Sequence, residues 1–475
     1  KINCNYKDFV FLALIFSMPF IIADVPYIDD LARMAVGYGW NQDGRVFATL
    51  LMKTLSLGYP LMDISPIPTL LAISSLVLAG YILSEVFEIN GRLNKAIIAI
   101  SMLSGPFIVQ NLSYQWDSLP MSLSMLLITC SIMFINNRNM FIFMTSIMLT
   151  LSMYLYQATI FAFPCLVILY LWKSYEGKGS RETVKLIITA SLASVAFIFT
   201  YKLSSLLINL EYSQSRADLV FFSSNPLVSI NNNIMALESV YKPYFSSITG
   251  KLVIFAYAIS VLTLLKCSLK KNALYALLGI VLPPAFMIMA SIVGVVIVNA
   301  PISPRVFSAL PLSILTIVIL SKNSRYSFVF VGVIVSFITI IQLYAYVNAL
   351  KSEYELQKSI ITQIAAKNDL YNKKIIINGS APMSNGAQIT LKHLPYLKGS
   401  IPIYLNNGWV WGRQLMENEG LIFKEQLLYS PDLDKQRNKA IKALCDIPVT
   451  TKSNLYTVRS NNSFVIIDFM RKQCH

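Results

Sequence analysis

The stretch MFIFMTSIMLTLSMYLYQATIFAFPCLVILYLW, residues 140–172, decides how this chain folds, because its 33 residues include no charged side chain. As one helix it would extend about 50 Å at 1.5 Å per residue. That length is too great for a single crossing of a hydrocarbon core about 30 Å thick. Tyr156-Gln157 and Pro164 indicate a break within it. The stretch therefore predicts a hairpin of two membrane spans, Met140–Tyr156 and Ala158–Trp172.

The composition of the whole chain agrees with a membrane protein. Of its 475 residues 55% are hydrophobic and only 13% are charged, and the mean hydropathy is +0.58. Soluble domains carry about 25% charged residues, so most of this surface is expected to meet lipid. The net charge of +15 comes from short basic clusters between apolar runs. This pattern indicates membrane topology and excludes a nucleic-acid-binding stripe, so no nucleic-acid partner is expected.

Nine further apolar stretches flank the hairpin and bring the predicted number of spans to eleven. The first of them carries no signal-peptide cleavage pattern and is expected to be a span. The chain is thus predicted to be an all-α polytopic membrane bundle, with Val46–Met62 as an amphipathic helix in the interface. The nine stretches are Phe9–Ala23, Thr69–Phe87, Ala96–Leu112, Leu119–Ile135, Val184–Ile208, Leu252–Leu265, Ala273–Val298, Val306–Leu320 and Tyr326–Val347.

The basic residues predict the orientation of this bundle. With the hairpin, fourteen Lys and Arg fall in the short loops on one side and seven on the other. Treating residues 140–172 as one span would move nine of the fourteen to the opposite side. Because cytoplasmic loops are rich in Lys and Arg, the N-terminus is predicted to be cytoplasmic. Loops 24–68 and 209–250 and the polar tail then lie outside.

The tail predicts a separate α/β domain over residues 349–475, after a membrane domain over residues 1–348. A helical pattern covers Leu350–Leu370, and strand-like runs follow at Lys374–Ile377 and Phe464–Phe469. Cys445 and Cys474 are the only cysteines in this tail. In an oxidising compartment they are a candidate disulfide pair.

The first outer loop contains the chemically most informative motif, Tyr27-Ile-Asp29-Asp30-x-x-Arg33, followed by Gly39-Trp40 and Gly44-Arg45. A carboxylate at the membrane surface can act as a general base toward a hydroxyl group. The planar guanidinium of arginine suits a phosphate leaving group. Tryptophan and tyrosine offer flat faces for a sugar ring.

The same residues also allow interpretations other than catalysis. Asp29 or Asp30 could simply cap an interfacial helix that starts at Leu31, with Arg33 in an ion pair on that helix. The two aspartates could also hold a divalent metal ion. With only two histidines and no CxxC pair in the chain, a zinc site is not expected.

Two other outer segments carry candidate site residues. Tyr114, Trp116 and Asp117 form an aromatic and acidic cluster that suits carbohydrate, although the aromatic pair would also fit the membrane interface. Arg305 lies at the mouth of the tenth predicted span. It is a candidate ligand for a lipid phosphate, or it extends toward the headgroups.

Acidic residues directly after the first span, then an interfacial helix and a bundle of this size, resemble the C-type glycosyltransferases. The motif from Tyr27 to Arg33, with Gly39-Trp40 and Gly44-Arg45, resembles more closely the type II phage-encoded glucosyltransferases that modify bacterial O-antigen in serotype conversion. The resemblance implies an inner-membrane enzyme with a periplasmic active site and no cofactor. It implies undecaprenyl-phosphate-glucose as donor and a lipid-linked O-antigen, part of lipopolysaccharide, as acceptor. A polyprenyl-phosphate-glucose synthase and a flippase would be its functional partners.

On this reading one of Asp29 and Asp30 is the base of a single-displacement, inverting reaction. Arg33, Arg45 and Arg305 would bind the donor phosphate, and the aromatic residues with Asp117 would bind sugar. Three competing functions are a lipid-linked sugar transporter or flippase, an O-antigen polymerase or ligase, and a non-enzymatic scaffold. A transporter predicts an internal repeat, which the sequence lacks, and a scaffold has no need of acids and arginines clustered at the membrane surface.

Overall fold

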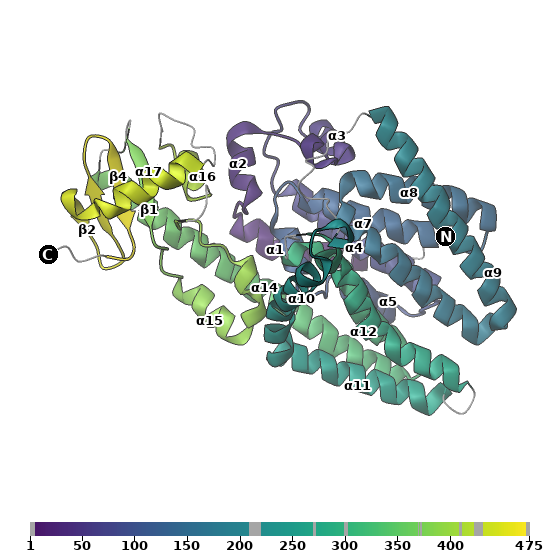
Figure 1. Ribbon diagram of the computed structural model, residues 1–475. Helices are drawn as coiled ribbons and strands as arrows, with labels where there is room; N and C mark the ends of the chain where they lie inside the picture. The colour runs from purple at the N-terminus through teal and green to yellow at the C-terminus, as the bar shows by residue number, and fades with distance from the viewer. Residues whose placement is uncertain are drawn as a thin grey trace.

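The computed structural model describes residues 5–208, 220–268, 272–298, 303–368, 370, 373–407, 411–421 and 431–471. For residues 177–180, 222, 431–434 and 436 it describes the backbone alone. A helical body holds most of the chain, and a small sheet domain stands at one end of it, joined by the long helix α14 (Arg325–Lys367) (Figure 1).

Seven helical segments of the described chain are long and apolar enough to cross a membrane. The protein is therefore a multi-pass membrane protein, while the number of eleven spans stays a prediction. The seven segments are α1 (Tyr6–Ala23), α4 (Ile67–Val86), two parts of η2–α9 (Gln157–Glu176 and Arg181–Ile208), α11 (Ile248–Ser268), α12 (Ala273–Val296) and α14.

The break predicted within residues 140–172 is confirmed. Helix α8 (Arg138–Leu155) ends before Tyr156, whose backbone is extended at φ −161° and ψ 107°. The short helix η2 (Gln157–Phe161) then leads into α9 (Ala162–Ile208), which packs along α8. The connection predicted after Trp172 is helical in the structure, because α9 continues through it.

The third predicted span, Ala96–Leu112, is wrong as a continuous helix. It consists of α5 (Arg92–Ser101) and α6 (Ile108–Ser113), separated by a turn that contains Gly105 and Pro106. Proline lacks the backbone N–H that an interior helix position needs. The Gln342 amide of α14 donates to the Pro106 carbonyl at 2.8 Å. The break is thus satisfied by a neighbouring helix.

Two further predicted spans are short helices inside the bundle. Helix α7 (Ser118–Ile132) has 15 residues, and α13 (Pro311–Leu320), which follows η5 (Pro304–Val306), has 10. Every residue of α13 is buried. Both are shorter than the roughly 20 residues that a crossing helix needs, so they are not among the seven segments named above.

The predicted outer loops contain helices of their own. The first loop folds into α2 (Asp29–Val36), η1 (Asn41–Asp43) and α3 (Val46–Leu55). The predicted helix over Val46–Met62 is therefore too long. In the described part of loop 209–250, η4 (Val220–Phe222) precedes α10 (Pro226–Ser246). Residues 209–219 of that loop lie outside the described residues.

The predicted C-terminal sheet is confirmed. Its strands run in the order β1-β4-β3-β2, with β1 parallel to β4 and the other pairs antiparallel. Strands β1 and β4 are the two runs predicted from the sequence. The elements are β1 (Lys374–Asn378), α15 (Asn385–His393), η6 (Pro395–Ser400), α16 (Trp411–Asn418), α17 (Pro431–Lys442), η7 (Leu444–Asp446), β2 (Val449–Lys452), β3 (Thr457–Ser460) and β4 (Phe464–Asp468).

Helix α14 connects the two parts rigidly. The last predicted span and the predicted tail helix are one helix of 43 residues, because no Gly or Pro interrupts it after Gly332. The predicted boundary at residues 348 and 349 falls inside this helix. Cys445, in η7, is disulfide-bonded. Its predicted partner, Cys474, lies outside the described residues.

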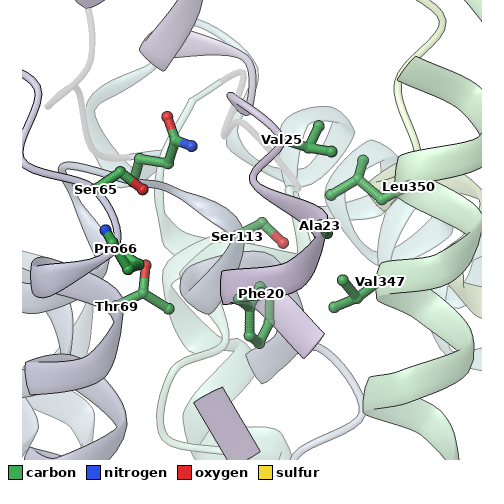
Figure 2. A pocket seen from close by; sticks show the side chains of 10 residues that line it. Phe20, Ala23, Val25, Ser65, Pro66, Thr69, Ser113, Val347 and Leu350 are labelled. Atoms are coloured by element: carbon green, nitrogen blue, oxygen red, sulfur yellow. The ribbon is translucent and has the colours of Figure 1, made fainter. Parts of the chain in front are cut away.

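A pocket lies between the end of α1, the start of α4 and the middle of α14 (Figure 2). Apolar side chains such as Phe20, Val347 and Leu350 form much of its wall, and Gln115 and Ser113 contribute polar atoms. The backbone N–H of Gln115 donates to Asp30 Oδ2, in the acidic motif of the first loop, at 2.8 Å.

Candidate functional site

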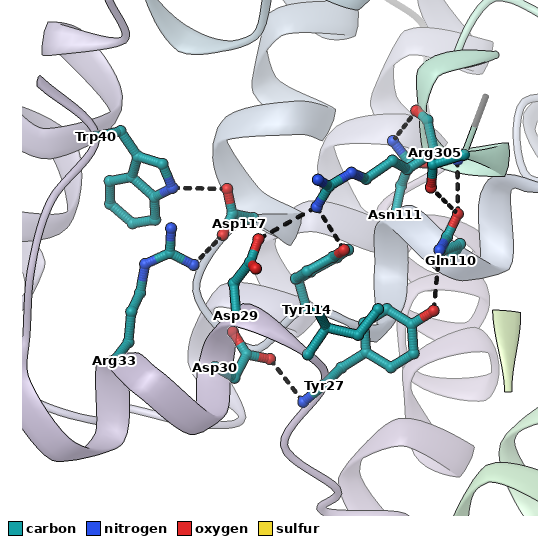
Figure 3. Close-up of polar contacts among 12 residues, drawn as sticks. Tyr27, Asp29, Asp30, Arg33, Trp40, Gln110, Asn111, Tyr114, Asp117 and Arg305 are labelled. Atoms are coloured by element: carbon teal, nitrogen blue, oxygen red, sulfur yellow. Dashed lines mark hydrogen bonds and ion pairs between the residues drawn. The ribbon is translucent and has the colours of Figure 1, made fainter. Parts of the chain in front are cut away.

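Helix α2 carries Asp29 and Arg33 one turn apart, on the side that faces the bundle. Asp29 forms an ion pair with Arg305, whose Nη1 lies 3.2 Å from Asp29 Oδ2 (Figure 3). The side chains of Asp29 and Arg305 are 26% and 29% exposed. Among the predicted site residues these two combine opposite charge with access to solvent.

The backbone around Arg305 is fixed by side chains of α6 and of the hairpin. Its N–H donates to Gln110 Oε1 at 2.7 Å, and its carbonyl accepts from Asn111 Nδ2 at 3.1 Å. The same carbonyl accepts from the Tyr156 hydroxyl at 3.0 Å. The guanidinium also donates to the Tyr114 hydroxyl at 2.5 Å. Arg305 is thus positioned by two separate segments of the chain, in addition to its ion pair with Asp29 of α2.

Asp117, at the start of α7, contacts two arginines and a tryptophan. It forms a buried ion pair with Arg33 and accepts from Trp40 Nε1 at 2.7 Å. Arg45 Nη1 lies 3.4 Å from Asp117 Oδ1, the oxygen that also accepts from Trp40. The Arg33 guanidinium stacks over the Trp40 ring, 4.3 Å from the centroid. Because both members of the Arg33 pair are at most 4% exposed, this pair is part of the wall of the site.

Glycines place Trp40 and Arg45 beside Asp117. A Cβ on Gly39 would lie 2.7 Å from Thr49 Oγ1, the group that accepts from the Trp40 N–H at 2.8 Å. Gly44 has φ +70°, a conformation that glycine adopts without steric cost. Arg45 follows directly and remains 20% exposed.

Arg45 also contacts the break in the predicted hairpin. Its Nε donates to Gln157 Oε1 at 3.1 Å, and its guanidinium lies 4.8 Å from the Tyr156 ring centroid. Tyr156, the extended residue between α8 and η2, therefore lines the site.

Asp30 has surroundings unlike those of Asp29. It is fully buried, and its Oδ2 accepts from the backbone N–H groups of Tyr27 at 3.0 Å and Gln115 at 2.8 Å. Its Oδ1 has no hydrogen-bond partner among the described residues. Burial raises the pKa of Asp30 well above its usual value. Asp30 therefore joins the segment before α2 to the loop before α7.

The two carboxylates of the motif thus face different partners, Arg305 for Asp29 and backbone amides for Asp30. Within the part of the chain that the structure describes, no group of three or more His, Cys, Asp or Glu side chains could hold a metal ion.

The predicted sugar-binding aromatic residues are all buried. Tyr27 and Tyr114 are fully buried and meet edge to face, with ring centroids 4.8 Å apart. Trp40 and Trp116 are each 1% exposed and pack in one apolar cluster with Met52. These rings form the framework around the charged groups.

Sequence reasoning missed several polar residues that hold the site together. Gln110 and Asn111 lie in an apolar stretch predicted to be a span, and polar side chains in such a stretch are a usable sign of function. Tyr156 and Gln157 served only as a break signal. Tyr38, whose ring lies 4.9 Å from the Arg33 guanidinium, gives no sign of its own in the sequence.

Comparison with known proteins adds independent information. A family model described as glucosyl transferase GtrII matches residues 18–340, which include Asp29, Arg45, Asp117 and Arg305. A protein of Salmonella phage P22, described as an uncharacterized 55.3 kDa protein in the gtrB 5′ region, is 24% identical over 446 residues. That match covers 88% of this chain and 91% of the phage protein. No solved structure matches the chain.

Proposed function

This chain belongs to the glucosyl transferase GtrII family, and we propose that it transfers glucose from undecaprenyl-phosphate-glucose to a sugar of lipid-linked O-antigen. The transfer takes place on the periplasmic face of the bacterial inner membrane, with the N-terminus cytoplasmic and the sheet domain periplasmic. The single observation that carries this proposal is the solvent-accessible Asp29–Arg305 pair at the end of a membrane bundle.

Asp29 is the general base in the proposed mechanism. Its carboxylate takes the proton of the acceptor hydroxyl while that oxygen bonds to C1 of glucose. The bond between C1 and the phosphate oxygen breaks, and its electron pair leaves with undecaprenyl phosphate. One displacement of this kind inverts the configuration at C1. The accessibility of Asp29 supports this role, and the burial of Asp30 between two backbone amides argues against it for the neighbouring residue.

Arg305 and Arg45 stabilise the departing phosphate. The phosphate changes from a diester with one negative charge to a monoester with up to two, so nearby fixed cations stabilise the transition state more than the ground state. Both guanidiniums are partly accessible, whereas Arg33 is held by Asp117. Burial raises the pKa of Asp30 and so disfavours a negative charge at that position. The three arginines around Asp29 and Asp117 therefore favour an anionic ligand.

The positions of the site residues in the chain support one face for the chemistry. Asp29, Asp117, Gln157 and Arg305 come from four different loops that the predicted topology assigns to the outer side. A lipid-linked donor whose headgroup lies at that surface needs no nucleotide site in the protein. A flippase is expected to supply the donor, and a polyprenyl-phosphate-glucose synthase to make it.

The proposal is tested by expressing the chain in an O-antigen-producing bacterium together with a polyprenyl-phosphate-glucose synthase and a matching flippase. New glucose on the O-antigen, seen by mass spectrometry only when the chain is present, is the expected result. A transporter would instead move lipid-linked sugar across the membrane without any change in the O-antigen, and a polymerase or ligase would change its length or attachment.

A further inference from the structure

We propose that the segment Ser400–Tyr404 of the C-terminal domain positions both members of the Asp29–Arg305 pair, with Tyr404 as the positioning residue for Asp29. This inference rests on the proposed function. It assigns a role in catalysis to a part of the chain that the family match, residues 18–340, does not cover.

The link from Tyr404 to Asp29 passes through the backbone before α2. Ile28 N–H donates to the Tyr404 hydroxyl at 3.1 Å, and that hydroxyl donates to the Pro26 carbonyl at 3.3 Å. Ile28 has φ +48° and ψ −99°, a conformation that a β-branched residue rarely adopts. Such a conformation persists only where its surroundings hold it. Tyr404 supplies two hydrogen bonds directly before Asp29 and so sets the direction in which α2 begins.

The link to Arg305 passes through Tyr27 and Gln110. The Tyr27 hydroxyl donates to the Ser400 carbonyl at 3.0 Å and accepts from Gln110 Nε2 at 3.0 Å. Gln110 Oε1 in turn accepts from the Arg305 N–H at 2.7 Å. The Tyr27 and Gln110 side chains are both buried, so water does not compete freely for the bonds.

The positioning segment is itself anchored to the long helix. Gln357 of α14, which is fully buried, accepts from the N–H groups of Tyr404 at 2.6 Å and Leu405 at 2.9 Å. Its amide donates to Glu353 Oε1 at 3.0 Å, and the other carboxylate oxygen of Glu353 accepts from Ser384 N–H at 2.8 Å. The membrane helix, the C-terminal domain and the acidic motif are thus joined by one continuous hydrogen-bond network.

The test compares Tyr404→Phe with Tyr456→Phe in the purified full chain. Tyr456 is also buried in the C-terminal domain, and its hydroxyl contacts Gln363 of α14. Tyr404→Phe is expected to lower kcat about 10- to 100-fold, since misplacing a reacting group by about 1 Å costs up to 10²-fold. The KM for the donor is expected to change less than about twofold, and the melting temperature to match that of Tyr456→Phe.

The coupling of Tyr404 to Asp29 is measured with Asp29→Asn and the double variant in single-turnover experiments. If Tyr404 acts through Asp29, adding Tyr404→Phe to Asp29→Asn lowers the residual rate no further. Wild-type kcat in Tyr404→Phe, equal losses in both tyrosine variants, or independent effects in the double variant would each overturn the proposal. Should Tyr404→Phe fail to fold, Gln110→Ala must show the same loss of kcat with unchanged KM, or the proposal fails. Full activity of Asp29→Asn would instead refute the assigned base of the proposed function.

Discussion

Asp29 and Arg305 are 276 positions apart in the sequence, and the fold brings the carboxylate of one to within 3.2 Å of the guanidinium of the other. The pair joins the first outer loop to the entrance of α13. Neither residue is completely buried. The proposed base and the proposed cation for the leaving phosphate are therefore side by side, and both are partly accessible to solvent.

The buried Asp30 predicts a pH dependence of stability. Its pKa in the folded protein is raised by burial, so above about pH 4 the unfolded chain loses this proton first. The native state then binds more protons, and stability decreases as the pH rises toward the folded pKa. Asp30→Asn has no such proton, so its unfolding free energy relative to wild type should increase from pH 4 to 7. Thermal unfolding of both proteins in detergent over this pH range measures the difference in their unfolding free energies. A difference that stays constant with pH would refute the raised pKa of Asp30.

The Arg33–Asp117 pair predicts a large effect on folding. Asp117→Asn leaves a buried arginine without its counter-charge, which costs about 3–5 kcal/mol. We expect a clear decrease in melting temperature. The matched control is Asp8→Asn, which removes the partner of the exposed Arg92 and should leave the melting temperature unchanged. Equal melting temperatures for the two variants would show that the buried pair has no structural role.

Replacement of Arg305 by lysine separates phosphate binding from simple attraction to headgroups. Lysine keeps the charge but loses the planar fork and its hydrogen bond to Tyr114. We expect Arg305→Lys to lower kcat by about 10- to 100-fold and Arg45→Lys to act in the same direction. Arg92→Lys, on the exposed Asp8 pair, is the control. Activity of Arg305→Lys equal to that of the control would exclude Arg305 from the transition state.

The predicted topology is tested with reporters. A reporter that is active only in the periplasm should work when fused after His475 and should be silent when inserted near Gly177. The reason is the distribution of Lys and Arg among the short loops. Activity at both positions would exclude the eleven-span arrangement and the periplasmic site with it.

The parts of the fold that the sequence predicts are those fixed by local pattern. Apolar length identifies α1, α4, α11 and α12, and short apolar runs between turn residues identify β1 and β4. The exceptions have physical reasons. Helix α14 continues past the predicted end of the membrane span, since no Gly or Pro interrupts it there. The third predicted span breaks at Gly105-Pro106, where Gln342 donates to the carbonyls that the break leaves without helix partners.

The sequence singles out the charged residues of the candidate site but not the partners of each. The motif residues Asp29, Asp30 and Arg33 are adjacent in sequence, and chemistry alone singles them out. The different surroundings of the two aspartates depend on long-range contacts. The Gln115 N–H donates to the buried Asp30, and Arg305 forms an ion pair with Asp29. Spacing along one loop contains no information about partners more than 80 positions away.

The central claim is tested most directly by the rate of glucose transfer from undecaprenyl-phosphate-glucose to lipid-linked O-antigen by purified wild-type and Asp29→Asn protein. Asparagine keeps the shape of the side chain but cannot take the proton, so the rate should decrease about 10²- to 10⁴-fold. Circular dichroism and the melting temperature should remain those of the wild type. Transfer by Asp29→Asn at a rate near that of the wild type would contradict the account.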